Sequence, residues 1–454
     1  MKPIRLLVLL LLISASAATA QEGNKIWTLQ DCIDHAWKNN IQVRQSELTV
    51  LTNEQFLKQA QWARVPNLNF SATGRNNVGR SIDPFTNLVR DQDITSQTYG
   101  LNSSVTLFNG MGQHNTVKQN EALLNKSIHD LENQKNITAL SIANQYLNIL
   151  LAQEQVKNGQ LSLATSKLQL ERTEKQVNAG AFPKQNLLQA KQQVANDEVN
   201  LITAENSLDL ARLVLRQALQ LPSTEVMEVE VPELSDPSET VLAVTLEEVF
   251  QSALSLPVVK SAEEQVKSSE FGLGVARSSL YPSLQLQAGL NTNWSSAAPD
   301  QFPDPGSPTG FKENTYWNQL DFNRARFVGL QLNVPIFNRF QVNTGVKRAK
   351  ITLQNSEYGL ANVKNQLRQN IEQAYYNARA ASKTYQATKQ QLDALEESFR
   401  NVEQRFNLGA TNSVEYNQIK NDFNRSQNDL IRTKYDFIFK LKVLDFYQGK
   451  PLQL

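Results

Sequence analysis

The chain has 454 residues, of which 45 are basic and 44 acidic, and it contains a single cysteine. A net charge near zero gives no reason to expect a polyanionic partner such as nucleic acid, and one cysteine excludes a fold held by intramolecular disulfides. The length would ordinarily indicate two or three globular domains. An internal repeat instead favours one elongated unit built from two equivalent halves.

The N-terminus has the pattern of a secretory signal. Lys2 and Arg5 precede a short apolar run at 6–13, and Ala18-Thr19-Ala20 is a small-x-small cleavage site. We therefore expect residues 1–20 to be a signal peptide that is removed after Ala20. No later stretch approaches 18 apolar residues, so no helix is expected to span a membrane, although strands could still enter one.

The first half of the mature chain, residues 21–222, is predicted to be mixed helix and strand. Thr28 is a plausible helix cap, and Pro66 stops that helix. Apolar and polar residues then alternate on both sides of a polar loop, which indicates a long hairpin. A run without proline follows and returns after Pro183. The expected elements are a helix at 28–65, strands at 66–74 and 96–108, a long helix at 111–178 and a return helix at 183–220.

Residues 223–244 separate the two halves and are rich in proline and glutamate. Met227, Val229 and Val231 alternate with glutamates, which predicts a short strand on the outside of the helical body. We expect this segment to be a linker between the halves.

Residues 245–454 repeat the first half. A constant shift of 229 residues relates Phe108 to Phe337 and continues without a gap to Pro222 and Pro451. The second half carries 13 extra residues, which fall in a Pro/Gly/Asp-rich loop at 295–323. The expected elements are a helix at 245–280, strands at 282–294 and 324–337, a long helix at 340–407 and a return helix at 413–447.

Apolar residues recur every seven positions along the long and return helices of both halves. Strict sevens predict paired helices in a left-handed supercoil. The long helices would each be about 100 Å in length at 1.5 Å per residue. The seam residues are Val156, Leu163, Leu170, Val177, Val194, Leu201, Leu208, Leu215, Tyr385, Leu392, Phe399, Phe406, Phe423, Leu430, Phe437 and Leu444.

The predicted hairpins are apolar on one face and polar on the other, as in the wall of an outer-membrane barrel. Four strands cannot close a barrel, and an open edge in lipid leaves backbone groups unsatisfied, so the barrel must be shared between chains. Two copies would give 8 strands, three 12 and four 16, and a conduit favours three or more. The lipid-facing residues are expected to be Leu68, Phe70, Leu101, Leu284, Leu286, Val328, Leu330, Leu332 and Val334.

These features together resemble the TolC family of outer-membrane channel proteins over the whole mature length. The matching motifs are the Thr28-Leu29 and Thr245-Leu246 helix starts, the Phe108-Asn109 and Phe337-Asn338 strand exits, and two Gly-Ala hairpin tips. The resemblance implies a mainly α fold with a membrane β-barrel and a coiled-coil tunnel through the periplasm. It implies that four strands from each copy of a homotrimer form a 12-stranded barrel, with residues 223–244 in an equatorial band.

The resemblance also implies where partners and a gate would lie. A periplasmic adaptor protein and an inner-membrane transporter would meet the hairpin tips. Family members close near these tips through acidic residues, and the corresponding positions here are Glu415 and Gln418, of which only the first is acidic. Glu415 could equally be a solvated acid in the first turn of a helix. The tip residues are Gly180, Ala181, Phe182, Pro183, Gly409, Ala410, Thr411 and Asn412.

The sequence carries no pattern typical of an enzyme, a cofactor site or a metal site. The three histidines are far apart, and Phe271-Gly-Leu-Gly274 lacks the third glycine and the strand of a nucleotide-binding loop. We therefore expect the outer-membrane exit duct of a tripartite efflux pump or type I secretion system. The alternative is a non-conducting periplasmic coiled-coil scaffold or adhesin, which has no need of a lipid-facing row of residues.

Overall fold

The computed structural model describes residues 26–82, 87–91, 93–225, 227–232 and 245–450. The expected signal peptide and most of the 223–244 segment lie outside these residues. The chain divides into two compact units. The first contains the chain up to Leu48 together with His129–Val259 and Val363–Leu454, and the second contains Thr49–Ile128 and Lys260–Asn362.

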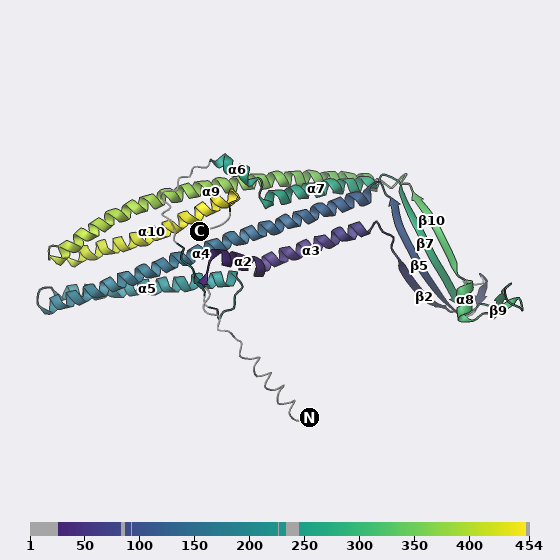
Figure 1. Ribbon diagram of the computed structural model, residues 1–454, viewed down its shortest axis with the longest axis horizontal. Helices are drawn as coiled ribbons and strands as arrows, with labels where there is room; N and C mark the ends of the chain where they lie inside the picture. The colour runs from purple at the N-terminus through teal and green to yellow at the C-terminus, as the bar shows by residue number, and fades with distance from the viewer. Residues whose placement is uncertain (1–25, 83–86, 92, 226, 233–244, 451–454) are drawn as a thin grey trace, which may run out of the picture. The chain divides into compact units, whose positions relative to one another are not determined.

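Two helical hairpins make up most of the first unit, and the first part of each long helix belongs to the second unit (Figure 1). One joins α4 (Gly112–Asn178) to α5 (Lys184–Ala218), and the other joins α9 (Gln341–Asn407) to α10 (Ser413–Tyr447). Both long helices have 67 residues and both return helices have 35. All sixteen residues of the predicted seams are buried or half-buried. The heptad pattern therefore marks where the helices pack.

The structure has two helices where the sequence indicated one at 28–65. Helix α2 (Leu29–Asn39) ends at Asn40, whose backbone is extended with ψ at 130°. The Asn40 side chain then accepts a hydrogen bond from the Gln42 amide at 2.9 Å, at the start of α3 (Ile41–Trp62). Asparagine is a preferred N-cap, so one residue ends the first helix with its backbone and begins the next with its side chain.

The predicted helix at 245–280 is also divided. Helix α6 (Leu246–Ala253) begins with a capping box between Thr245 and Glu248. Helix α7 (Pro257–Ser278) begins at a proline, whose missing N–H is no loss in the first turn of a helix. The apolar periodicity runs through both breaks, whereas the capping residues end one helix and start the next.

A hydrophobic core in the first unit holds the short strand pair of β1 (Ile26–Trp27) and β6 (Glu228–Val229), which run parallel. Tyr146 of α4 donates its hydroxyl to the carbonyl oxygens of Trp27 at 3.2 Å and Glu230 at 2.7 Å, and burial raises the pKa of this tyrosine. The expected short strand is present as β6; Val229 is buried in the core, whereas Val231, two residues on, is 57% exposed. Polar flanking residues had suggested exposure, but the apolar side of the strand packs inward.

The second unit contains a four-stranded antiparallel sheet in the order β10-β7-β5-β2 (Figure 1). The outermost strands are therefore β2 and β10. The strands are β2 (Asn69–Asn77), β5 (Ile94–Phe108), β7 (Ser283–Ser295) and β10 (Ala325–Asn333).

Smaller elements occupy the two connections between these strands. Two short hairpins are β3 (Arg80–Ile82) with β4 (Val89–Asp91), and β8 (Gln301–Pro303) with β9 (Phe311–Glu313). Helix α8 (Tyr316–Phe322) follows β9. The 295–323 segment, expected to be a loop, therefore contains a helix and a hairpin.

The register gives the sheet one apolar and one polar face. Val105 pairs with Leu286, which pairs with Leu330, and side chains directly opposite one another share a face. One position along, Ser104 pairs with Gln287, whose side-chain amide donates to Gln331 at 2.7 Å. The exposed side chains of the apolar face include Val328 at 77% and Leu330 at 66%.

The two glycines of the Phe271-Gly-Leu-Gly274 segment lie inside α7, where they allow close packing on α4. A Cβ at Gly274 would come within 2.8 Å of the Asn115 side chain, and one at Gly272 within 3.0 Å of Gln119. Small residues at these positions therefore let the two helices approach closely.

Candidate functional site at the helix-hairpin tips

The two hairpin tips turn in the same way. Gly180 and Gly409 adopt left-handed backbone angles, with φ at 74° and 71°. In each case the next residue donates its amide to a carbonyl five positions back, Ala181 to Gln176 at 2.9 Å and Ala410 to Arg405 at 2.8 Å. This is a Schellman motif, in which glycine is favoured because it has no Cβ.

Aromatic side chains fill the space behind the tips. Phe406 stacks on Tyr416 with ring centroids 4.7 Å apart, which holds α9 against α10. Phe399 stacks on Phe423 at 5.3 Å one layer further in. Phe182, from the other tip, lies 6.0 Å from Phe406. Aromatic pairs therefore hold α9 against α10, and Phe182 of the first hairpin packs beside them.

Glu415 lies in the first turn of α10 and has partners in its own hairpin. Asn412 caps the helix by accepting the Glu415 amide at 2.9 Å, and Thr411 donates its hydroxyl to the Glu415 carboxylate. Arg405 of α9 lies 3.5 Å from the same carboxylate. The carboxylate is half-exposed, so part of it is available to solvent. Gln418, one turn further along the helix, is exposed.

The equivalent positions of the first hairpin behave differently. Asn186 and Gln189 both accept a hydrogen bond from the hydroxyl of Ser413, on the opposite hairpin. These first-half side chains therefore face the neighbouring hairpin, whereas Glu415 is paired within its own. The duplication thus preserves the turn but not the side-chain contacts.

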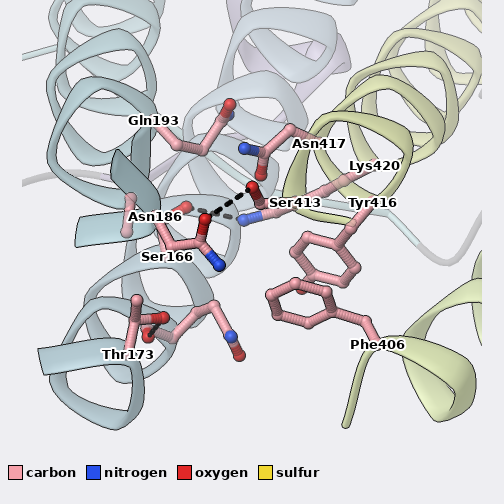
Figure 2. Close-up of a pocket in the computed structure, with 11 residues that line it drawn as sticks. Ser166, Thr173, Asn186, Gln193, Phe406, Ser413, Tyr416, Asn417 and Lys420 are labelled. Atoms are coloured by element: carbon pink, nitrogen blue, oxygen red, sulfur yellow. Dashed lines mark hydrogen bonds between the residues drawn. The ribbon is translucent and has the colours of Figure 1, made fainter. Parts of the chain in front are cut away.

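A network of buried polar side chains joins the two hairpins further from the tips, and Figure 2 shows three of its members, Ser166, Gln193 and Lys420. Lys420 of α10 donates from Nζ to Ser166 Oγ of α4 at 2.6 Å and lies 3.6 Å from the carboxylate of Asp197 on α5. Ser166 also donates to Asp197. Gln193 Nε2 donates to Asp197 at 3.0 Å and to Asn421 at 3.0 Å. Three helices are connected through one cluster.

The charged pair in this network is shielded from water. The side chains of Lys420 and Asp197 are each 3% exposed. Burial lowers the pKa of the Lys420 ammonium, and the Asp197 carboxylate acts in the opposite direction. Burial also raises the pKa of Tyr416 to about 12, so its hydroxyl stays protonated at neutral pH. Removing one partner of such a pair leaves an uncompensated buried charge, which costs about 3–5 kcal/mol.

Sequence reasoning did not find this network, although a signal for it was present. The predicted seams contain one residue per heptad, such as Val194 and Leu201 on the first return helix and Phe423 on the second. Asp197 lies three residues after Val194, and Lys420 three before Phe423. The 229-residue shift relates Val194 to Phe423, so if both are given position a, Asp197 falls at d and Lys420 at e. Both charges therefore lie beside the apolar seam, where a buried charge calls for a partner of opposite sign.

Among the described residues, no group of three or more His, Cys, Asp or Glu side chains is placed to hold a metal ion. No helix of the same described residues has both the length and the apolar character needed to cross a bilayer. The chemistry that the tips offer is therefore one of packing, hydrogen bonding and charge.

Comparison with known proteins gives consistent matches. The family model described as "Outer membrane efflux protein" matches residues 32–220 and 251–447. Outer membrane protein TolC of Escherichia coli K12 is 22% identical over 303 residues, which cover 66% of this chain and 58% of that protein. Outer membrane efflux protein BepC of Brucella suis is 20% identical over 414 residues, with 90% of this chain and 83% of that protein covered.

A solved structure shows the same fold. The outer membrane protein VceC of Vibrio cholerae superimposes with a TM-score of 0.75 at 16% identity, covering 94% of this chain and 97% of that one. The mainly helical, TolC-like fold expected from the sequence is thereby confirmed.

Proposed function

The chain belongs to the outer membrane efflux protein family, and on this premise we propose that it is an exit duct in the outer membrane. In this proposal the duct carries substrates passively from the periplasm to the exterior and performs no chemistry on them. The family is one of channel proteins rather than enzymes. Secretion would use the signal peptide at 1–20, cleaved after Ala20.

The two-faced sheet is the observation that carries the proposal. Its apolar face exposes Leu68, Phe70, Val328, Leu330 and Leu332, each by more than 60% of its area. Its outermost strands β2 and β10 have partners on one side only among the described residues. In lipid each unpaired backbone group would cost several kcal/mol. The chain is thus suited to completing its wall with further copies.

Three copies fit the requirements of a conduit. They would supply 12 strands, whereas the 8 strands of a dimer enclose only enough space for their own side chains. The polar face with Gln287 and Gln331 would then line the lumen, and the apolar face would meet lipid. A homotrimer is accordingly part of the proposal. A non-conducting scaffold would have no use for a sheet whose faces differ in this way.

The hairpin tips are the proposed meeting point with a periplasmic adaptor protein, which in turn would serve an inner-membrane transporter. The supporting observation is exposure, because Leu408 is 84% exposed and Val414 is 59% exposed at the second tip. Glu415, with Gln418 one turn further along, would line the periplasmic aperture, where three copies of its carboxylate would form a ring that attracts cations.

Opening would require the tip helix pairs to move outward. We expect a covalent bridge between the hairpins to prevent this movement. The hydrogen-bonded pair Asn186 and Ser413 joins the first hairpin to the second, with 3.4 Å between Oδ1 and Oγ. In a Cys32→Ser background, the double variant Asn186→Cys/Ser413→Cys would be treated with a short reagent that bridges two thiols.

Treatment should abolish export from whole cells. The measurement is the accumulation inside the cells of fluorescent compounds that cells with the unmodified protein expel. The matched control is Phe399→Cys/Phe423→Cys, whose bridge lies inside the second hairpin and leaves the two hairpins free to part. Loss of export in the first variant alone supports the proposal. Full export in a verified, bridged Asn186→Cys/Ser413→Cys protein contradicts it.

A further inference from the structure

Helix α8 belongs to the segment that carries the 13 extra residues of the second half. It packs on the sheet where β5 begins and β7 ends. Tyr316 donates its hydroxyl to Gln97 Oε1 at 2.9 Å and lies 2.7 Å from the hydroxyl of Tyr99. Thr292 donates to the carbonyl of Leu320 at 2.5 Å, and the ring of Trp294 lies 5.7 Å from that of Tyr316. The contacts therefore come from side chains of β5 and β7.

The register shows which face of the sheet α8 covers. Gln97 pairs with Trp294, Tyr99 pairs with Thr292, and Leu101 pairs with Leu290. Side chains two positions apart on a strand share a face, so these three rows continue the apolar rows that include Leu286. Helix α8 thus lies on the apolar face, which the proposed function turns toward lipid, and not on the polar face.

Aromatic side chains lie at both ends of the apolar face, which also carries Arg326, the partner of Leu290. At the level nearer the long helices, Phe108 pairs with Leu284. Tyr281, shortly before β7, and Phe337, shortly after β10, are both exposed. At the other level lie Trp294 and the aromatic residues of α8. Ten residues separate Leu284 from Trp294, or about 34 Å along the strand. With a strand tilt of about 40° this gives a height of about 26 Å, which matches the roughly 25 Å apolar band between aromatic girdles.

The outward surface of α8 mixes aromatic and charged groups. Trp317 is 76% exposed and Phe322 52%. Asp321 on the same helix pairs with Arg324 at 3.5 Å. Charges of this kind are costly in hydrocarbon, whereas tryptophan and tyrosine are enriched at the headgroup level, where one side of the ring is apolar and the other is wet. The surface therefore suits the boundary of a bilayer better than its interior.

The position of α8 on the sheet argues against a second copy as its partner. Neighbouring copies would meet at the outermost strands β2 and β10, whereas α8 rests on β7, inside the sheet. Gln319, which is 1% exposed, fixes it there by hydrogen bonds to both the backbone amide and the carbonyl of Ser295. The helix is therefore preformed on the wall, away from the expected subunit junctions.

We propose that α8 is an interfacial anchor, lying in the headgroup layer of the outer leaflet with Trp317 inserted among the lipids. It would fix the depth of the barrel wall in the membrane at its outer rim. The partner is the lipid surface itself, and the proposal rests on the proposed function because it requires the apolar face to meet lipid.

The first test measures the depth of single labelled positions. In a Cys32→Ser background, Trp317→Cys, Val328→Cys and Gly306→Cys would each carry a nitroxide in protein reconstituted into phospholipid vesicles. Collision rates with oxygen and with a water-soluble nickel complex report depth. We expect position 328 in hydrocarbon, 306 in water and 317 between them.

The outcomes separate the two proposals. If position 328 is in lipid but 317 is as accessible to nickel as 306, the anchor is contradicted and the duct is not. If position 328 itself is in water, the lipid-facing wall fails, and the proposed function fails with it. An intermediate depth at 317 together with a buried 328 supports both.

A second test uses the native side chain, because labelling removes the indole. Quenching of tryptophan fluorescence by lipids brominated near the headgroup should fall in Trp317→Phe relative to the unmodified protein. Trp37→Phe is the matched control, since Trp37 is partly buried in the first unit and donates to the Lys135 carbonyl. Equal quenching in Trp317→Phe and in the unmodified protein would contradict the anchor.

Discussion

The tip of the α4–α5 hairpin and the tip of the α9–α10 hairpin have the same backbone turn but different side-chain chemistry. Both turn through a left-handed glycine with the same two amide hydrogen bonds. The N-cap residue of the first return helix, Pro183, makes no side-chain hydrogen bond, whereas that of the second, Asn412, accepts one from the Glu415 amide. The two halves therefore share the glycine turn that the backbone requires, but differ in the side chains that surround it.

The divergence extends to charge. At positions related by the 229-residue shift, Asn186 contacts the opposite hairpin, and Glu415 is paired with Arg405 inside its own. The buried Lys420 likewise corresponds to Lys191, which is exposed. Residues related by the 229-residue shift therefore differ in burial and in contacts. In each such pair, a substitution in one residue is the control for the same substitution in the other.

The largest effect is expected from the buried ion pair. Lys420→Met leaves Asp197 buried without its charge partner and should destabilise the packed hairpins by about 3–5 kcal/mol. Its matched control, Lys191→Met, changes an exposed residue and should remain within about 0.5 kcal/mol. The thermal unfolding midpoint, followed by circular dichroism of the purified protein, measures both.

A double variant sharpens this result. Asp197→Leu/Lys420→Met replaces the whole pair with apolar side chains and should recover most of the lost stability, because a buried pair contributes little net stability beyond a well-packed apolar core. Equal unfolding midpoints for Lys420→Met and Lys191→Met would show that the two lysines are in equivalent environments.

The tip glycines should show equal and smaller effects. Gly180→Ala and Gly409→Ala each place a Cβ on a left-handed residue, at about 1–2 kcal/mol, with no atom within 4 Å to add a clash. Gly345→Ala, inside α9 and also without a nearby atom, should instead stabilise by about 0.5–1 kcal/mol. Unfolding midpoints that differ widely between the two tip variants would disprove that the turns are equivalent.

Substitutions at the two N-cap residues should lower stability by different amounts. Asn412→Ala removes a side-chain acceptor from the Glu415 amide and should cost about 1 kcal/mol. Pro183→Ala removes no cap hydrogen bond and should cost less. The ratio of the two costs, obtained from the same unfolding curves, tests the difference, and a larger loss in the proline variant would reverse the comparison.

The smallest effect concerns charge at the proposed aperture. Glu415→Gln should lower the preference for cations over anions, and Gln418→Glu, which adds a second acidic position, should raise it. The reversal potential across a bilayer with unequal potassium chloride on the two sides measures this preference. If neither variant moves the reversal potential, Glu415 does not line the aperture, and its carboxylate only pairs with Thr411 and Arg405 inside its own hairpin.

The seams of the hairpins were accessible from the sequence because a period of seven is a property of the helices themselves. Residues such as Leu208, Phe437 and Leu444 recur at that spacing and are buried. The breaks at Asn40 and Pro257 were missed because one capping residue overrode a periodicity that continued on both sides. Local chemistry, at the scale of one side chain, decided those boundaries.

Two parts of the molecule depended on contacts that the sequence alone does not reveal. Lys420 and Asp197 lie on different hairpins, so their pairing required the lateral packing of α10 against α5. Helix α8 has only seven residues within a segment rich in proline and glycine, and its place is set by Gln319 binding the end of β7. In both cases the long-range partner determined the structure, and the local pattern did not.

Recording from a planar lipid bilayer tests the central claim that several copies complete one another's wall around a conducting lumen. The purified, unmodified protein would be added to one side, with voltage applied in both directions. Stepwise increases in current of uniform size, each from one inserted assembly, are the predicted result. A bilayer that contains the protein but shows no current steps at any voltage would contradict the account, if a variant that weakens a tip, such as Asn412→Ala, shows none either.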